Sequence, residues 1–330
     1  MPKLVLIDAN HLMHRAYWAI QRNLSTSDGT ITNAVFGVTS MLLTILKREH
    51  PEALVACWDD GSETFRHERY DEYKAGRQET PDDFYDQIPI TKRCFEVFAV
   101  PVISDPKYEA DDLLGTLAIS GANEGFEVII VSGDKDLFQM AGDNIKVAIP
   151  NKGYAEPEYL DYEGVRKKIG VYPEQVPDYK GLTGDPSDNL KGVKGIGPKT
   201  AAGLIEEYGS LDNIYENLNQ IKGSAKDKLE ADKESAFFCR DMAVIVKDIE
   251  TGLDLREIAN RKSNLQDVEK FFSDVEFYTL KSRLKKMVAE DSFAREYFSG
   301  NFSAQDTEDS SYETKEDLGR ITEEQLPLLD

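Results

Sequence analysis

Glu109-Ala110-Asp111-Asp112 places three carboxylates within four residues, at the start of a stretch whose leucines have helical spacing. A short apolar run, residues 100–103, comes just before it. Acids stabilise a helix N-terminus by about 0.3–1 kcal/mol each, so one or two of them here would need no further explanation. The same arrangement recurs along the chain, however, and this recurrence indicates the fold class.

Three more apolar runs of four or five residues end in carboxylates. They are residues 4–7 before Asp8, residues 54–58 before Asp59, and residues 128–131 before Asp134 and Asp136. Such runs are typical of strands buried on both faces of a parallel sheet. The functional site of an open α/β sheet lies beyond the carboxyl ends of its strands, so we expect carboxylates from all four stretches to meet.

The order of strands and helices predicts an α/β domain with a mainly parallel central sheet up to about residue 150. Helical spacing is found over residues 11–20, 34–48, 88–98 and 111–124, and residues 145–149 form the last expected strand. Beyond residue 162 the signals are almost all helical, with single helices expected over residues 226–246 and 264–287.

Composition limits the chemistry. No apolar run approaches the ~20 residues of a membrane span, and no signal peptide is visible. Three cysteines without Cys-x-x-Cys spacing indicate a reduced cytoplasmic protein with no zinc site. Because only four histidines are present, carboxylates binding Mg²⁺ or Mn²⁺ suit this chain better than histidine-based catalysis.

The formal net charge of −22 is a caution against tight non-specific binding to nucleic acid. The acids are unevenly spread, because residues 301–330 hold nine of them against two basic residues. Basic faces can therefore coexist with the acidic total, and any affinity for DNA should fall steeply with salt. The acidic tail is poor in apolar residues until its end and is predicted to be disordered.

Residues 61–86 differ from their surroundings, because they are polar, carry both charges and interleave aromatic with basic residues. Two interpretations are open. The segment is either a solvated surface loop that contains a helix, or a basic–aromatic segment that contacts phosphates and stacks on bases.

Two further stretches stand out in the helical half. In Gly184-Asp185-Pro186-Ser187-Asp188-Asn189, an N-cap aspartate followed by proline is a good helix start with no chemistry implied. Gly192-Val193-Lys194-Gly195-Ile196-Gly197-Pro198-Lys199 is either an ordinary tight turn or a glycine-rich hairpin that holds DNA phosphates.

The carboxylates need counter-charge, because ionised acids at short range raise one another's pKa and cost stability. Two divalent cations ~3.5–4 Å apart would supply that charge and would support phosphodiester hydrolysis. Spacing alone does not fix the substrate.

Seven motifs in unbroken order over residues 3–290 resemble the 5′-nuclease family. That family includes the 5′→3′ exonuclease domain of bacterial DNA polymerase I, the phage 5′-exonucleases and the flap endonucleases. The motifs are Leu6-Ile7-Asp8-Ala9-Asn10, Trp58-Asp59 with Thr64-Phe65-Arg66, Tyr73-Lys74 with Arg77, Glu109-Ala110-Asp111-Asp112 with Gly115 to Ala118, Ser132-Gly133-Asp134-Lys135-Asp136, Gly184-Asp185 with Ser187-Asp188-Asn189, and Gly192 to Ala201. Because these 330 residues include no polymerase motif after the nuclease motifs, we expect the chain to resemble a free-standing member.

For the fold, the resemblance implies a PIN-like α/β catalytic domain over residues 1–170, with a helical arch over about 61–98. An all-helical region with a helix–three-turn–helix DNA-binding motif would cover residues 171–298. A disordered acidic tail would follow at residues 299–330.

For the active site, the resemblance implies two ions of Mg²⁺ or Mn²⁺. Their ligands would be Asp8, Glu109, Asp111 and Asp112 chiefly around one ion, and Asp134, Asp136, Asp185 and Asp188 around the other. Asp59 matches a further active-site acid. Lys74 and Arg77 match arch cations that contact the scissile phosphate and stabilise charge in the transition state.

The resemblance also implies a DNA surface, with K⁺ bound by backbone carbonyls of the hairpin. Its residues would be Arg15, Arg66, Tyr73, Gly192, Lys194, Gly195, Gly197 and Lys199. The expected substrates are branched or nicked DNA with a free 5′ end, including 5′ flaps and RNA-primed duplex, acted on by a monomeric cytoplasmic enzyme of replication or repair. Gln325-Leu326-Pro327-Leu328-Leu329 resembles short peptides that dock in bacterial sliding clamps.

Two rival functions are a PIN-like ribonuclease and a catalytically inactive DNA-junction binding protein. The glycine hairpin and the long helical region disfavour the first, because small PIN ribonucleases lack them. The full set of acids disfavours the second, because a pure binding protein would gain stability by losing those charges.

Overall fold

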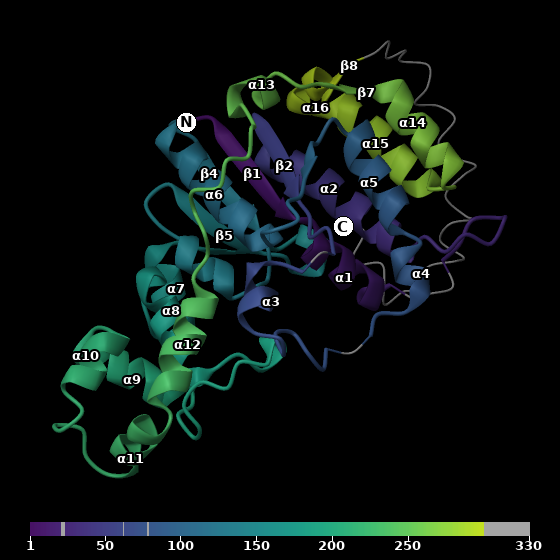
Figure 1. Cartoon of the computed structure of the whole chain (residues 1–330). Helices are drawn as coiled ribbons and strands as arrows, with labels where there is room; N and C mark the ends of the chain where they lie inside the picture. The colour runs from purple at the N-terminus through teal and green to yellow at the C-terminus, as the bar shows by residue number, and fades with distance from the viewer. Residues whose placement is uncertain (21–23, 62, 78, 300–330) are drawn as a thin grey trace.

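A six-stranded sheet lies at the centre of the molecule (Figure 1). The computed structural model describes residues 1–20, 24–61, 63–77 and 79–299. The strands lie in the order β3 (Val102–Ile103), β2 (Ala53–Cys57), β1 (Lys3–Asp8), β4 (Glu127–Val131), β5 (Ile145–Ile149) and β6 (Glu158–Leu160). The first five are parallel, which confirms the predicted mainly parallel sheet.

Strand β5 is not the last strand, contrary to the expectation from the sequence. The chain reverses through the short 3-10 helix Lys152–Tyr154, where Gly153 has a φ of 66°, and β6 then pairs with β5 in antiparallel fashion. Lys152, Gly153 and Tyr154 all have positive φ, at 44°, 66° and 93°, so three consecutive residues in the left-handed half of φ space turn the chain here. Strand β6 contains only three residues, two of them exposed, so its sequence carried no apolar run.

Both faces of the sheet are buried. Alternate residues of β1 point to opposite sides, so that Val5 and Ile7 join one apolar core and Leu4 and Leu6 join another. This two-sided burial is why the central strands have continuous apolar sequences instead of alternating ones.

One face is covered by helices from both ends of the chain. They are α1 (Ala9–Ala19), α2 (Asn33–Glu49), α5 (Ile88–Val97), α14 (Leu265–Asp274), α15 (Tyr278–Glu290) and α16 (Ser292–Tyr297). Phe272 packs against Phe98 with ring centroids 6.1 Å apart, and β7 (Ser263–Asn264) pairs with β8 (Phe298–Ser299).

The C-terminal helices therefore share a core with the N-terminal domain, although we expected residues 171–298 to form one separate helical region. The apolar stripe of α14, which includes Val268 and Phe271, is fully buried against the N-terminal helices. The guanidinium of Arg283 donates to the hydroxyls of Ser40 and Thr44 on α2.

The other face is covered by α6 (Ala110–Asn123), by α13 (Leu255–Ala259) and by part of a helical region that extends away from the sheet (Figure 1). That region contains α7 (Tyr162–Ile169), α8 (Val176–Thr183), α9 (Pro198–Tyr208), α10 (Leu211–Glu216), α11 (Ser224–Ala231) and α12 (Lys233–Ala243). Short 3-10 helices at Asp136–Met140, Pro173–Gln175 and Pro186–Asp188 complete the fold.

Two helices predicted as continuous are each divided. The stretch over residues 226–246 is broken at Asp232, which ends α11 and precedes α12 with a φ of −116° and a ψ of 24°. The stretch over residues 264–287 is broken at Val275–Phe277, where Glu276 has a φ of 59°. Local apolar spacing continues across both breaks, so periodicity alone did not reveal them.

The segment between β2 and α5 crosses the carboxyl ends of the strands (Figure 1). It contains two short helices, α3 (Phe65–Arg69) and α4 (Asp82–Tyr85). We name residues 61–87 the arch segment. It is tied to the helical region, because the N–H of Lys74 donates to the carbonyl of Asp188 over 3.1 Å.

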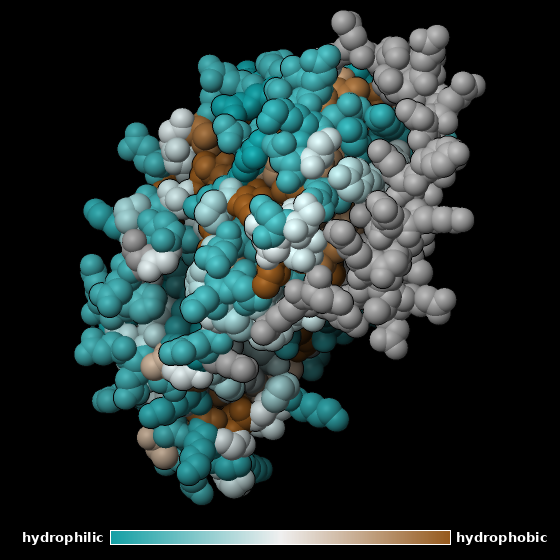
Figure 2. Space-filling view, turned by 90° about the vertical axis from the view of Figure 1, so that its right-hand side faces the viewer, coloured by the Kyte–Doolittle hydropathy of each residue, from teal (hydrophilic) through white to brown (hydrophobic). Residues whose placement is uncertain are grey.

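The face of the molecule drawn in Figure 2 is largely hydrophilic where residues are coloured, with scattered apolar patches. Within the described residues, no helix combines the length and the apolar character that crossing a membrane would require.

Candidate active site

Carboxylates from three strand ends and one helix start meet in a cavity of about 300 Å³. Asp8 ends β1, Asp59 follows β2, Asp134 follows β4, and Asp111 lies in the first turn of α6. The cavity is lined by Asp8, Asn10, His11, His14, Asp59, Lys74, Arg77, Glu109, Ala110, Asp111 and Asp134. The fold therefore brings together carboxylates from all four stretches, as expected from the sequence.

Ser132 positions two of these acids. Its hydroxyl donates to Oδ2 of Asp8 over 2.7 Å and accepts the N–H of Asp134 over 3.0 Å. Residue 133, between Ser132 and Asp134, must be small, because a Cβ on Gly133 would lie 2.6 Å from Nε2 of His11. We did not predict Ser132 or His11 as site residues, although Ser132 stands in one of the motifs.

Asp112 lies behind the cavity instead of lining it. Its side chain is fully buried, and its two oxygens accept from Arg66 over 2.6 and 2.9 Å. The backbone N–H groups of Glu109 and Val246 donate to the same carboxylate over 3.1 and 2.9 Å. We expected Asp112 to be a metal ligand, but this geometry leaves its oxygens engaged by the protein and favours a structural role.

Arg66 is correspondingly buried, although we expected it to contact DNA. Besides Asp112, its guanidinium donates to Glu109 and to the backbone carbonyls of Met242 and Val244. Burial opposes the charge, but the bond to Asp112 outweighs it and raises the pKa of Arg66. Arg66 therefore fastens the arch segment to the end of α12 and to α6.

Three further residues of the arch segment reach the acids directly. The ammonium of Lys74 contacts Oε1 of Glu109, and the guanidinium of Arg77 contacts Oδ1 of Asp188. The hydroxyl of Tyr73 lies 3.1 Å from Oε2 of Glu109 and 3.2 Å from Oδ2 of Asp188. Tyr73, which we expected at the DNA surface, is buried.

Asp136, Asp185 and Asp188 form a second group of acids, with carboxylate oxygens all within 4.8 Å of one another. An all-oxygen set of this size fits a hard divalent cation. Asp134 lines the first cavity with Asp8 and Asp111, whereas we expected it chiefly in the second group. Asp185 is also the N-cap of a short 3-10 helix, because its Oδ1 accepts the N–H of Ser187 over 3.0 Å.

Lys180 of α8 is a site residue that we did not predict. Its side chain is buried, and its ammonium contacts Oδ1 of Asp136 and Oδ2 of Asp185. It lies outside the motifs, so no local signal marked it. The turn closed by the bridge between Asp185 and Leu190 holds Asp185 beside α8, and α8 packs against the 3-10 helix that begins at Asp136.

Burial shifts the titration of the acids. Loss of solvent raises the pKa of Asp8 to about 7 and that of Asp136 to about 7. Burial, together with the charges of Asp134 and Asp8, raises the pKa of Asp111 well above its usual value. Burial opposes ionisation of Asp185 as well, but the charge of Lys180 lowers the pKa of that carboxyl. Added positive charge would therefore favour the ionised form of Asp8 and Asp111 in the first group and of Asp136 in the second.

The hairpin is separate from the acidic cavity. Lys194, Gly195 and Lys199 are exposed at the start of α9, and the N-cap of that helix is Gly197. Gly192 is buried, and a Cβ there would lie 2.2 Å from the N of Gly184, so it closes the turn of residues 184–192.

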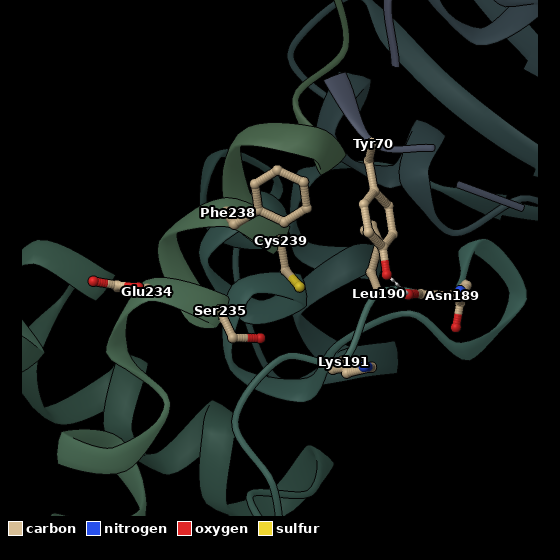
Figure 3. A pocket seen from close by; sticks show the side chains of 8 residues that line it. All are labelled: Tyr70, Asn189, Leu190, Lys191, Glu234, Ser235, Phe238 and Cys239. Atoms are coloured by element: carbon tan, nitrogen blue, oxygen red, sulfur yellow. Dashed lines mark hydrogen bonds between the residues drawn. The ribbon is translucent and has the colours of Figure 1, made fainter. Parts of the chain in front are cut away.

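Arg15, another predicted DNA contact, lines a small hollow between α1 and α2 together with Gly37 and Met41. A larger cavity, of about 410 Å³, is lined by Asn189, Leu190 and Lys191 of the turn formed by residues 184–192 (Figure 3). There Tyr70 of the arch segment faces Phe238 of α12, with ring centroids 5.4 Å apart and an interplanar angle of 78°. This cavity is mainly apolar and lies beside the contact between the arch segment and α12.

Comparison with known proteins agrees with this architecture. The family described as "5'-3' exonuclease, N-terminal resolvase-like domain" matches residues 3–170, and "5'-3' exonuclease, C-terminal SAM fold" matches residues 171–266. DNA polymerase I of Mycobacterium tuberculosis is 40% identical over 284 residues, which are 86% of this chain and 31% of the relative. DNA polymerase I of Bacillus subtilis is 39% identical over 289 residues, 87% of this chain and 33% of the relative.

The chain thus spans about a third of the length of the curated relatives it matches. Among solved structures, T5 5′-exonuclease with bound zinc has a TM-score of 0.60 and 20% identity, with 82% of this chain and 97% of that chain covered. The catalytic core of Rad2 in complex with DNA has a TM-score of 0.55 and 18% identity, with 83% and 88% covered. The two family matches together cover most of the chain, and the protein belongs to the 5′-3′ exonuclease family.

Proposed function

We propose that the protein is a divalent-metal-dependent, structure-specific 5′ nuclease that hydrolyses phosphodiester bonds in DNA. The observation that carries this proposal is the meeting of Asp8, Asp59, Asp111 and Asp134 in one cavity beneath the cations of the arch segment. The buried carboxylates could hold divalent metal ions. The neighbouring cations could stabilise the negative charge that develops on the phosphate during hydrolysis.

The residues present fit two ions of Mg²⁺ or Mn²⁺. Asp8, Asp111, Asp134 and Glu109 would hold one, and Asp136, Asp185 and Asp188 would hold the other. When bound, such ions lower the pKa of a water molecule and neutralise charge on the leaving oxygen.

Lys74 and Arg77 would position the scissile phosphate. Both now contact carboxylates, Glu109 and Asp188, and a phosphate entering the cavity would compete for the same donors. Arg66 and Asp112 hold the base of the arch segment, so the cations approach the phosphate from a fixed side. Asp59 accepts the N–H of Ala110 over 2.7 Å and would orient the start of α6.

The hairpin would hold the duplex through Lys194, Lys199 and the free N–H groups at the start of α9. We expected K⁺ at the backbone carbonyls there. The ammonium of Lys228 already donates to the carbonyl of Gly195 over 3.0 Å, so this lysine occupies one of the carbonyls expected to bind K⁺. Duplex affinity measured in K⁺ and in Na⁺ at equal ionic strength would test the proposed K⁺ site.

The expected substrates are 5′ flaps, nicks and RNA-primed duplex, met in replication or repair by a cytoplasmic monomer. Residues 325–329, which resemble clamp-binding peptides, lie outside the described residues. Deleting residues 325–330 should abolish binding to a bacterial sliding clamp and leave cleavage unchanged. Equal clamp affinity after the deletion would reject that role.

One assay separates the proposed function from its rivals. A 5′-labelled flap DNA, a single-stranded RNA and a blunt DNA duplex are each incubated with Mg²⁺ or with EDTA. Flap cleavage that requires Mg²⁺ supports the proposal. Cleavage of RNA alone would indicate a PIN-like ribonuclease, and retention of junction DNA without cleavage would indicate a binding protein.

A further inference from the structure

Lys180 contacts two of the acids that would hold the second divalent cation. Its ammonium contacts Asp136 and Asp185, which are two of the three acids whose oxygens lie within 4.8 Å of one another. The third acid, Asp188, is contacted from the solvent side by Arg77 and from inside by Tyr73. Two cations of the protein itself, Lys180 and Arg77, thus compensate most of the charge of the three carboxylates, and Tyr73 adds a neutral donor.

The first group of acids differs. Asp8 is bound by the hydroxyl of Ser132 and by a backbone N–H, and both are neutral donors. Asp111 faces other carboxylates, chiefly Asp134 and Asp8. Lys74 reaches this cavity through Glu109 at its rim. The cations beside the first group thus pair with Glu109 at the rim, while Asp8 accepts from neutral donors; in the second group, Lys180 contacts two of the three acids directly.

An ammonium and a divalent ion cannot use the same oxygens at once. An ammonium sits about 2.7–2.9 Å from a carboxylate oxygen and Mg²⁺ about 2.0–2.1 Å from it, and both cations would occupy one small volume. Binding of a metal ion must therefore move Lys180 away from Asp136, Asp185 or both. The apparent affinity for the metal falls by the fraction of molecules in which the lysine has withdrawn.

We propose that Lys180 is the resident counter-cation of the Asp136–Asp185–Asp188 group, which keeps these acids together before a metal arrives and makes the second divalent ion bind more weakly than the first. This inference rests on the proposed two-ion site. It assigns to Lys180 a positioning and affinity-setting role, distinct from contact with the substrate.

The test determines the number of Mn²⁺ sites in the full chain without DNA and the affinity of each site. Binding is followed by calorimetry and by the electron paramagnetic resonance of free Mn²⁺. Lys180→Met removes the charge and keeps an unbranched side chain that is one atom shorter. Lys135→Met is the matched control, because Lys135 is exposed, carries the same charge and precedes Asp136 directly. Lys180→Gln serves as a second variant if the methionine variant does not fold.

In the wild type we expect one tighter and one weaker Mn²⁺ site. Lys180→Met should tighten the weaker site by about tenfold or more and leave the tighter one unchanged, while Lys135→Met changes either by less than about twofold. In EDTA, Lys180→Met should also lower the urea midpoint of unfolding, and Mn²⁺ should restore it.

A weaker site that is unchanged or loosened in a natively folded Lys180 variant would overturn the inference and leave the two-ion site standing. A wild-type chain that binds fewer than two Mn²⁺ would overturn the two-ion site and the inference with it. The two failures are thereby told apart by the wild-type titration alone.

Discussion

Adjacent residues of the first helical turn of α6 should respond in opposite ways to the same substitution. Asp111 lies in the acidic cavity, where burial and neighbouring carboxylates raise its pKa. Asp112 is fully buried one layer behind, in a bidentate pair with Arg66. Asp111→Asn and Asp112→Asn each remove one negative charge and keep the shape of the side chain, so each is the control for the other.

Asp112→Asn should destabilise the metal-free protein strongly. Removing one partner of a buried ion pair leaves the other charge uncompensated and costs about 3–5 kcal/mol. Arg66 is only 3% exposed and retains Glu109 at 3.2 Å as its remaining carboxylate, so water cannot replace the lost partner. Against a total stability of about 5–15 kcal/mol, this loss is a large fraction.

Asp111→Asn should leave the stability of the metal-free protein unchanged or raise it, because it removes repulsion between carboxylates. Its effect should appear in metal binding instead, with loss of the tighter Mn²⁺ site and of cleavage. Asp112→Asn should retain most of the Mn²⁺ affinity, provided that the protein is folded at the temperature of the titration.

Urea denaturation in EDTA, followed by circular dichroism, measures the stability of both variants, and calorimetry with Mn²⁺ measures binding. The structural role of Asp112 is refuted if Asp112→Asn unfolds at the wild-type urea concentration and loses a metal ion. That result would return Asp112 to the metal ligands, as the family resemblance implied.

Three further outcomes are expected. Lys74→Ala should lower the single-turnover rate on a 5′ flap DNA by ~10²-fold or more if Lys74 contacts developing charge, and an unchanged rate would make the lysine structural only. Folded Asp8 and Asp136, with pKa values raised from 3.8 to about 7, keep protons that the unfolded chain releases. Metal-free stability should therefore fall as pH rises from about 4 to 7 in urea titrations, and saturating Mn²⁺ should reverse the slope. Gly192→Ala should lower the melting temperature, because its Cβ would lie 2.2 Å from the N of Gly184, whereas Gly197→Ala, which meets no atom within 4 Å, should not.

The sequence by itself determined the part of the fold that depends on short windows. Four apolar runs ending in acids were enough to predict a mainly parallel sheet with carboxylates at one edge. A window of a few residues shows both that a strand is buried and where it ends. The order of the motifs then identified the family. Breaks at Asp232 and Glu276 were missed, because apolar spacing continues through both of them.

Only the tertiary structure decided which of the acids face the cavity and which are held by cations. Asp111 and Asp112 are equivalent in sequence, yet helical geometry turns one toward Asp8 and the other toward Arg66, 46 positions away. Lys180 meets Asp136 across 44 positions of sequence. Such pairs depend on how elements that are distant in sequence pack together. A local sequence pattern does not predict this packing, so only the folded structure shows which charged residues pair with one another.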